Sequence, residues 1–135
     1  MDHSKPKIFI VDDNTTFRWV LANFIRNSGE FELVGEASNG IECLSKIENL
    51  EIDVILMDIN MPELNGIQTS KIINQQSRSY PRIIALTQYD EFEYVKSMIK
   101  AGAKGYIHKS DVGKQLKDAI KKVINGDFYI PLQLI

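Results

Sequence analysis

The sequence predicts a doubly wound α/β fold, in which helices cover both faces of one parallel sheet. Short apolar runs alternate with amphipathic stretches five times along the 135 residues, a pattern typical of parallel strands joined by right-handed helical crossovers. The apolar runs are nearly continuous, as expected of strands that are buried on both faces. Since no linker, tandem repeat or low-complexity segment interrupts this pattern, we expect residues 1–135 to form a single three-layer domain.

The expected strands are short and rich in β-branched residues. The first, "KIFIV" at residues 7–11, is apolar after Lys7. The second, residues 31–37, alternates between apolar and polar residues, so we expect it nearer an edge of the sheet. The other three strands are expected at residues 53–58, 82–87 and 105–109.

The first helix is predicted by an apolar stripe at i, i+3, i+4, i+7 and i+8. This stripe consists of Phe17, Val20, Leu21, Phe24 and Ile25. Asn14 or Thr15 could cap the helix at its start, and Gly29 could end it. Four further helices are expected at residues 40–49, 66–76, 90–101 and 112–125.

Composition excludes several classes of protein. The net charge of −2 gives no basic field for nucleic acid, so we expect no direct DNA contact by this chain. One cysteine, Cys43, cannot form an internal disulfide, which agrees with a reducing compartment. No apolar run is long enough to span a bilayer, and the first residues lack the apolar core of a signal peptide. We therefore expect a cytoplasmic protein without membrane contact.

Polar residues follow four of the expected strands. Asp12 and Asp13 follow the first strand, and Asp58, Thr87 and Lys109 end the third, fourth and fifth. In an open parallel sheet, ligands bind outside the carboxyl ends of the strands. We therefore expect these side chains to converge at one edge if the four strands lie close together.

Such a cluster suits phosphoryl transfer. Three neighbouring carboxylates repel one another unless a cation neutralises them, and Mg²⁺ prefers oxygen ligands. A carboxylate can attack phosphorus, and a lysine and a threonine can bind phosphoryl oxygens. Each residue alone also has an ordinary structural explanation, such as a helix cap, a strand residue or a surface lysine. The whole set at strand ends is hard to explain in that way.

Four segments resemble the receiver domain of bacterial two-component response regulators, over Lys7 to about Gly126. They are "VDD" (11–13), "LMDINMPELNG" (56–66), "ALT" (85–87) and "GAKGYIHK" (102–109). The resemblance implies a flavodoxin-like (βα)5 fold with strand order 2-1-3-4-5. "LVGEASNG" (33–40) is most similar to the NarL/FixJ subgroup, whose receivers precede a LuxR-type helix-turn-helix domain.

The resemblance also implies a role for each matching residue. Asp58 would be the phosphoacceptor, and Thr87 and Lys109 would bind its phosphoryl oxygens. Asp13 would ligate Mg²⁺ (or Mn²⁺) directly, and Asp12 would help through the metal or a bound water.

Four further positions would adjust the switch. Asn60 would ligate the metal through its backbone carbonyl, and Tyr106 would turn inward when Thr87 moves toward the phosphate. Asn60 and Tyr89 flank the site and would influence the access of water; the alternative is that Asn60 solvates its loop and Tyr89 packs on the surface. Gln88 is larger than the residue often found there, so we expect it to slow exchange with small phosphodonors.

The implied partner is a sensor histidine kinase or a phosphotransfer protein, and phosphorylation would favour a homodimer. The resemblance implies a switch that regulates transcription through a DNA-binding domain, and we expect no such domain within this chain. It would not be an enzyme beyond its own phosphorylation and dephosphorylation. The alternatives are a stand-alone single-domain regulator and an interaction module that works without phosphorylation.

Two other classes fit the sequence less well. A flavin carrier needs a loop with free N–H groups after the first strand, where Asp12 and Asp13 would repel its phosphate. A phosphatase with an aspartate nucleophile generally carries a second acid two residues later, where this chain has Asn60.

Overall fold

The computed structural model describes residues 4–76, 81–88 and 92–130. In these ranges the elements are β1 (Lys7–Val11), α1 (Thr15–Ser28), β2 (Glu32–Ala37), α2 (Gly40–Ile47), β3 (Val54–Asp58), α3 (Gly66–Gln76), β4 (Arg82–Thr87), α4 (Phe92–Lys100), β5 (Gly105–His108), the short 3-10 turn η1 (Lys109–Asp111) and α5 (Val112–Ile124). The strands form one parallel sheet in the order β2-β1-β3-β4-β5. This confirms the predicted fold and strand order.

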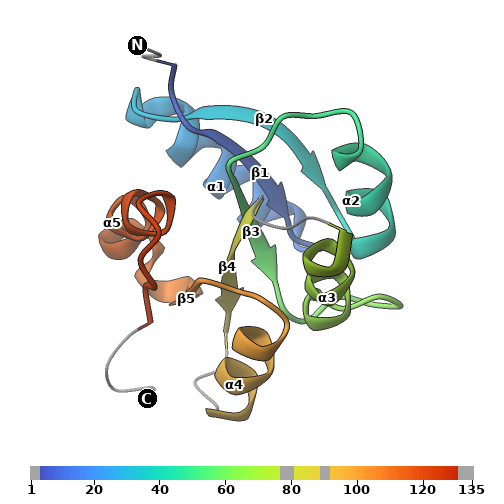
Figure 1. Cartoon of the computed structure of the whole chain (residues 1–135). Coiled ribbons are helices and arrows are strands. Elements are labelled where there is room, and N and C mark those ends of the chain that lie inside the picture. The colour runs from blue at the N-terminus through green and yellow to red at the C-terminus, as the bar shows by residue number, and fades with distance from the viewer. Residues whose placement is uncertain (1–3, 77–80, 89–91, 131–135) are drawn as a thin grey trace.

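The sheet separates two hydrophobic layers, with α1 and α5 on one face and α2, α3 and α4 on the other (Figure 1). Alternation along each strand divides its side chains between these layers. In β1, Ile8 and Ile10 pack with α1 and α5, whereas Phe9 and Val11 pack on the opposite side. The four buried residues of β1, Ile8 to Val11, are therefore all apolar, which is the pattern expected of a strand buried on both faces.

Helix α1 begins and ends at the signals found in the sequence. The Asn14 side chain accepts a hydrogen bond from the Phe17 N–H, so Asn14 rather than Thr15 is the cap. Gly29 ends the helix in the left-handed conformation, with φ of 71°. A residue without Cβ adopts this conformation at little cost.

The apolar stripe that the sequence predicts for α1 contains one exposed residue, Val20. Leu21 and Ile25 are fully buried, as expected, but Val20 is 45% exposed. The buried face is centred between Leu21 and Ile25 and includes Ala22. Because successive helix residues are turned by about 100°, Val20 lies at the rim of this face.

The fifth strand is one residue shorter than expected. It ends at His108, and Lys109 is the first residue of the 3-10 turn η1. The polypeptide after α5 continues to pack beyond Gly126. Tyr106 N–H donates to the Tyr129 carbonyl (2.9 Å), and Tyr129 N–H donates to the Lys104 carbonyl (2.9 Å). This pairing covers part of the open edge of β5. None of the described helices is long and apolar enough to cross a membrane.

We predict that Ile25→Ala and Val20→Ala will differ sharply in stability, although both residues belong to the predicted stripe. Ile25 is fully buried, so its truncation should lower the free energy of unfolding by about 2–5 kcal/mol. Val20→Ala should stay within about 0.5 kcal/mol of the wild type. Chemical denaturation of both variants tests this, and equal losses would contradict the burial described for α1.

Candidate functional site

Three carboxylates meet at the carboxyl edge of the sheet. Asp12 and Asp13 follow β1, and Asp58 ends β3, the strand that pairs directly with β1. Each residue offers one oxygen, and these oxygens all lie within 4.8 Å of one another. Asp12 and Asp58 are buried, whereas Asp13 is exposed. The parallel pairing thus places acids that are far apart in sequence around one point.

Lys109 neutralises part of this charge. Its Nζ lies 2.9 Å from Asp12 Oδ2 and 3.4 Å from Asp58 Oδ1. The lysine side chain is only 9% exposed, so water screens these ion pairs weakly. Because Lys109 follows β5, its side chain reaches past the end of β4 to acids on β1 and β3.

The environment of Asp58 opposes its ionisation. Burial is the main cause, and the charge of Asp12 adds to it. Asp13 acts in the same direction through a hydrogen bond and its charge, whereas Lys109 acts in the opposite direction. Together these effects raise the pKa of Asp58 to about 7. A further cation bound at the cluster would favour the ionised carboxylate.

Local hydrogen bonds fix Asp12 in place. Its N–H donates to the Ala37 carbonyl (3.1 Å), and its Oδ1 accepts from the Asn14 N–H (2.8 Å). Arg18 Nη1 donates to the Asp12 carbonyl (2.5 Å), while Arg18 Nε lies 3.5 Å from Glu36 Oε1. The turn after β1 is therefore tied to both α1 and β2.

A glycine allows the chain to return close beneath Asp58. A Cβ at Gly66 would collide with the Asp58 carbonyl oxygen. The Gly66 N–H donates to the Ile59 carbonyl (2.8 Å). Next to it, Asn65 and Gln68 exchange side chain to backbone hydrogen bonds that cap α3. The short segment "DINMPELNG" thus brings the start of α3 directly against the acid.

The structure also describes the other predicted site residues, with the exception of Tyr89. Thr87 ends β4 and is buried, and Tyr106 in β5 is buried on the side of α2, α3 and α4. Asn60 and Gln88 are exposed. A cavity of about 410 Å³ is lined by Asp13, Asn14, Asp58, Asn60, Gln88 and Lys109. Tyr89 lies outside the described residues.

One imidazole links the ends of β4 and β5. His108 Nε2 lies 2.9 Å from the carbonyl oxygen of Gln88, and Nδ1 accepts from the Ser110 N–H (3.1 Å). Protonation on Nε2 alone satisfies both contacts. His108 therefore connects the residue that follows Thr87 to the residue that follows Lys109.

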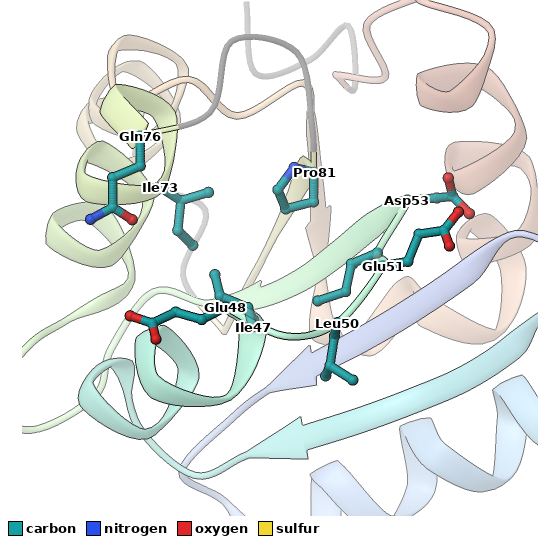
Figure 2. A pocket seen from close by; sticks show the side chains of 9 residues that line it. Ile47, Glu48, Leu50, Glu51, Asp53, Ile73, Gln76 and Pro81 are labelled. Atoms are coloured by element: carbon teal, nitrogen blue, oxygen red, sulfur yellow. The ribbon is translucent and has the colours of Figure 1, made fainter.

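A larger cavity, of about 680 Å³, lies at the opposite end of the sheet, between α2, the start of β3 and the end of α3 (Figure 2). Its lining includes Ile47, Leu50, Asp53, Ile73 and Pro81. It contains none of the three clustered acids. Ligands of open parallel sheets bind at the carboxyl ends of strands, so the smaller, acidic cavity is the candidate functional site.

The site suits a hard divalent cation. Its donors are carboxylate oxygens, the ligands that Mg²⁺ and Mn²⁺ prefer. Asp12 Oδ2 is buried and forms an ion pair with the Lys109 ammonium. Among the described residues, no donor makes a hydrogen bond of good geometry to this oxygen. The three acids could therefore hold a metal ion in a site that exists before the ion arrives.

Two residues that contact the site were not identified as site residues from the sequence. The Lys109 Nζ lies 4.7 Å from the centre of the Phe17 ring, and Arg18 binds the Asp12 carbonyl. Phe17 was predicted only as a core residue of α1. Its apolar spacing carries no signal that a ring edge or face meets a charged group.

Comparisons with known proteins identify close similarity over almost the whole chain. Residues 8–121 match the family model described as the response regulator receiver domain. The chain is 34% identical, over 132 residues and 96% of its length, to the transcriptional regulatory protein DegU of Brevibacillus brevis. It is 38% identical, over 128 residues and 92% of its length, to the oxygen regulatory protein NreC of Staphylococcus carnosus. It covers 55% and 57% of these two relatives, a little over half of each.

A solved structure gives the same result. The crystal structure of a LuxR-family two-component response regulator from Aurantimonas sp. SI85-9A1 superposes with a TM-score of 0.90. The match covers 97% of this chain and 93% of that one, at 25% sequence identity.

We predict that Gly66→Ala will destabilise the protein by about 1–3 kcal/mol, because the added methyl group meets the Asp58 backbone. Gly113→Ala is the matched control. Nothing lies near a Cβ at this position in α5, so alanine should stabilise the helix by up to about 1 kcal/mol. Chemical denaturation measures both, and a neutral Gly66→Ala would contradict the close approach.

We predict that Asp58→Asn will raise the thermal midpoint of the metal-free protein at about pH 8 more than at about pH 5. The pKa of Asp58 is about 7 in the folded protein, compared with an ordinary value of 3.8 for an aspartate outside it. This group therefore lowers stability as pH rises from 4 towards 7, and the full penalty remains above 7. Asparagine removes the penalty. Scanning calorimetry with a chelator tests this, and an equal gain at both pH values would refute it.

Proposed function

The chain belongs to the response regulator receiver domain family, with relatives of the NarL/DegU type, and from this we propose that it is a signalling switch controlled by phosphorylation of Asp58. One observation carries the proposal: Asp58 ends β3 within a cluster that contains two further acids and the Lys109 ammonium. This arrangement combines a nucleophile with the charges that phosphoryl transfer requires.

The proposed donor is a phosphohistidine on a sensor histidine kinase or a phosphotransfer protein. An Asp58 carboxylate oxygen attacks the phosphorus, the new O–P bond forms, and the N–P bond breaks. The electron pair of that bond returns to the departing imidazole. Lys109 and the Thr87 hydroxyl bind phosphoryl oxygens in this proposal. A Mg²⁺ ion, held by Asp12, Asp13, Asp58 and the Asn60 carbonyl, would neutralise charge on the incoming group.

Phosphorylation would then shift the balance between two states of the protein. New contacts of the phosphoryl group with Thr87 and Lys109 would stabilise one state over the other. Thr87 and Tyr106 lie on the neighbouring strands β4 and β5, so a displacement at Thr87 can reach the surface around α4 and β5. Asn60, Gln88 and Tyr89 are proposed to control the access of water and small donors.

The proposed output is transcription. The relatives include a "transcriptional regulatory protein" and a LuxR-family response regulator, and this chain spans a little over half of each curated relative described above. We propose that a DNA-binding domain outside residues 1–135 contacts DNA and that phosphorylation favours a homodimer. The receiver would act on no separate substrate.

We predict that incubation with Mg²⁺ and acetyl phosphate will add one phosphoryl group, seen by intact-mass spectrometry. Asp58→Asn and a chelated sample should show no adduct, because one lacks the nucleophile and the other the cation. Asp53→Asn is a control that keeps the site, since Asp53 lies at the opposite end of β3.

Labelling of Asp58→Asn equal to the wild type would exclude Asp58 as the acceptor. If acetyl phosphate fails, a phosphorylated histidine kinase replaces it as the donor. Failure of both donors with folded protein would favour the interaction module that works without phosphorylation.

A further inference from the structure

The Lys109 ammonium has three described contacts, and one of them is aromatic. Two are ionic, with Asp12 Oδ2 at 2.9 Å and Asp58 Oδ1 at 3.4 Å. The third is the ring of Phe17, whose centre lies 4.7 Å from Nζ. An ammonium at this distance is attracted by the negative face of a ring, and the attraction grows when water is excluded. The Lys109 side chain is only 9% exposed.

We propose that Phe17 is a positioning residue for Lys109, which keeps the ammonium at the mouth of the site when the acids are engaged elsewhere. This inference rests on the proposed function of the site. The two ionic contacts depend on the same carboxylates that could hold a cation. The ring contact does not, so it persists when those charges are neutralised.

Phe17 is well fixed for this task. Its backbone N–H donates to the Asn14 side chain (2.9 Å), which sets the first turn of α1. Its ring is half-buried and packs against the layer formed by α1 and α5. The ring therefore stays beside the end of β5 without support from the ammonium.

The packing role and the charge role of Phe17 can be separated by substitution. Leucine at this position keeps an apolar side chain but removes the ring, whereas tyrosine keeps the aromatic face. Phe24 provides a matched control, because it lies in the same helix, is also half-buried and packs against the same layer. No contact between Phe24 and Lys109 is found among the described residues.

The first measurement is the chemical shift of the Lys109 side-chain protons in the metal-free protein, which shows whether the Phe17 ring lies beside them. Protons bonded to Cε of Lys109, assigned by their loss in Lys109→Arg, should resonate upfield of those of other lysines in a ¹H–¹³C correlation spectrum. Phe17→Leu should return them to the ordinary range, and Phe24→Leu should leave them shifted. An unshifted signal in the wild type would overturn the proposal, whether or not the protein is phosphorylated.

The second measurement is the rate constant of phosphorylation at saturating Mg²⁺ and acetyl phosphate. Phe17→Leu should lower it about fivefold, the size expected of one partly desolvated cation–π contact. Phe17→Tyr and Phe24→Leu should stay within about twofold of the wild type, and calorimetry should show nearly unchanged Mg²⁺ affinity for all three.

The outcomes distinguish the two proposals. A wild type that takes no phosphoryl group contradicts the proposed function, while the spectrum still decides whether the ring holds Lys109. A wild type that is phosphorylated, with equal rates in Phe17→Leu and Phe24→Leu, shows that the ring only packs. Thermal unfolding of each variant confirms that folded protein is compared.

Discussion

The mutual repulsion of three carboxylates is the constraint on which the rest of this structure depends. Parallel pairing of β1 with β3 brings carboxylate oxygens of Asp12, Asp13 and Asp58 within 4.8 Å of one another. The buried setting of Asp58 makes its charge costly. The lysine after β5 offsets this cost from two strands away. Five strands with their ends at one edge are what allow so distant a residue to serve as the counter-charge.

Contacts from the surrounding loops hold the three acids close together against their mutual repulsion. Arg18 and the cap residue Asn14 fix the backbone and one oxygen of Asp12. On the other side, the close approach of Gly66 places the start of α3 against Asp58. These contacts come from the Arg18 guanidinium, from the Asn14 N–H and from the start of α3. The site is therefore preorganised by the same interactions that make the fold, as an arrangement of like charges requires.

The sequence carries strong signals for the parts of the molecule that repeat a pattern. Alternating apolar runs, apolar helix stripes and polar residues at strand ends predict the parallel sheet and the meeting of the acids. The strand order is expected from the resemblance to receiver domains and not from these patterns. The patterns do not define geometry between elements. The exposure of Val20 depends on the orientation in which α1 packs on the sheet. The ring of Phe17 contacts Lys109 only because α1 and the end of β5 are close together in space. The hydrogen bond between His108 and the Gln88 carbonyl joins the ends of two strands, so no spacing within one segment of the sequence predicts it. Such contacts depend on the tertiary packing of side chains, which a pattern along one chain does not specify.

The segment after α5 has a mechanical consequence. Tyr129 hydrogen-bonds through its backbone to both Lys104 and Tyr106, on either side of the first residue of β5. Three residues beyond Tyr106, the same stretch of chain presents Lys109 to the acids. Strand β5 therefore connects the acidic site, through Lys109 after its end, to the segment that follows α5, through Tyr129 at its start. A displacement of β5 is therefore transmitted to the segment around Tyr129 that follows α5, and a displacement of that segment is transmitted to β5.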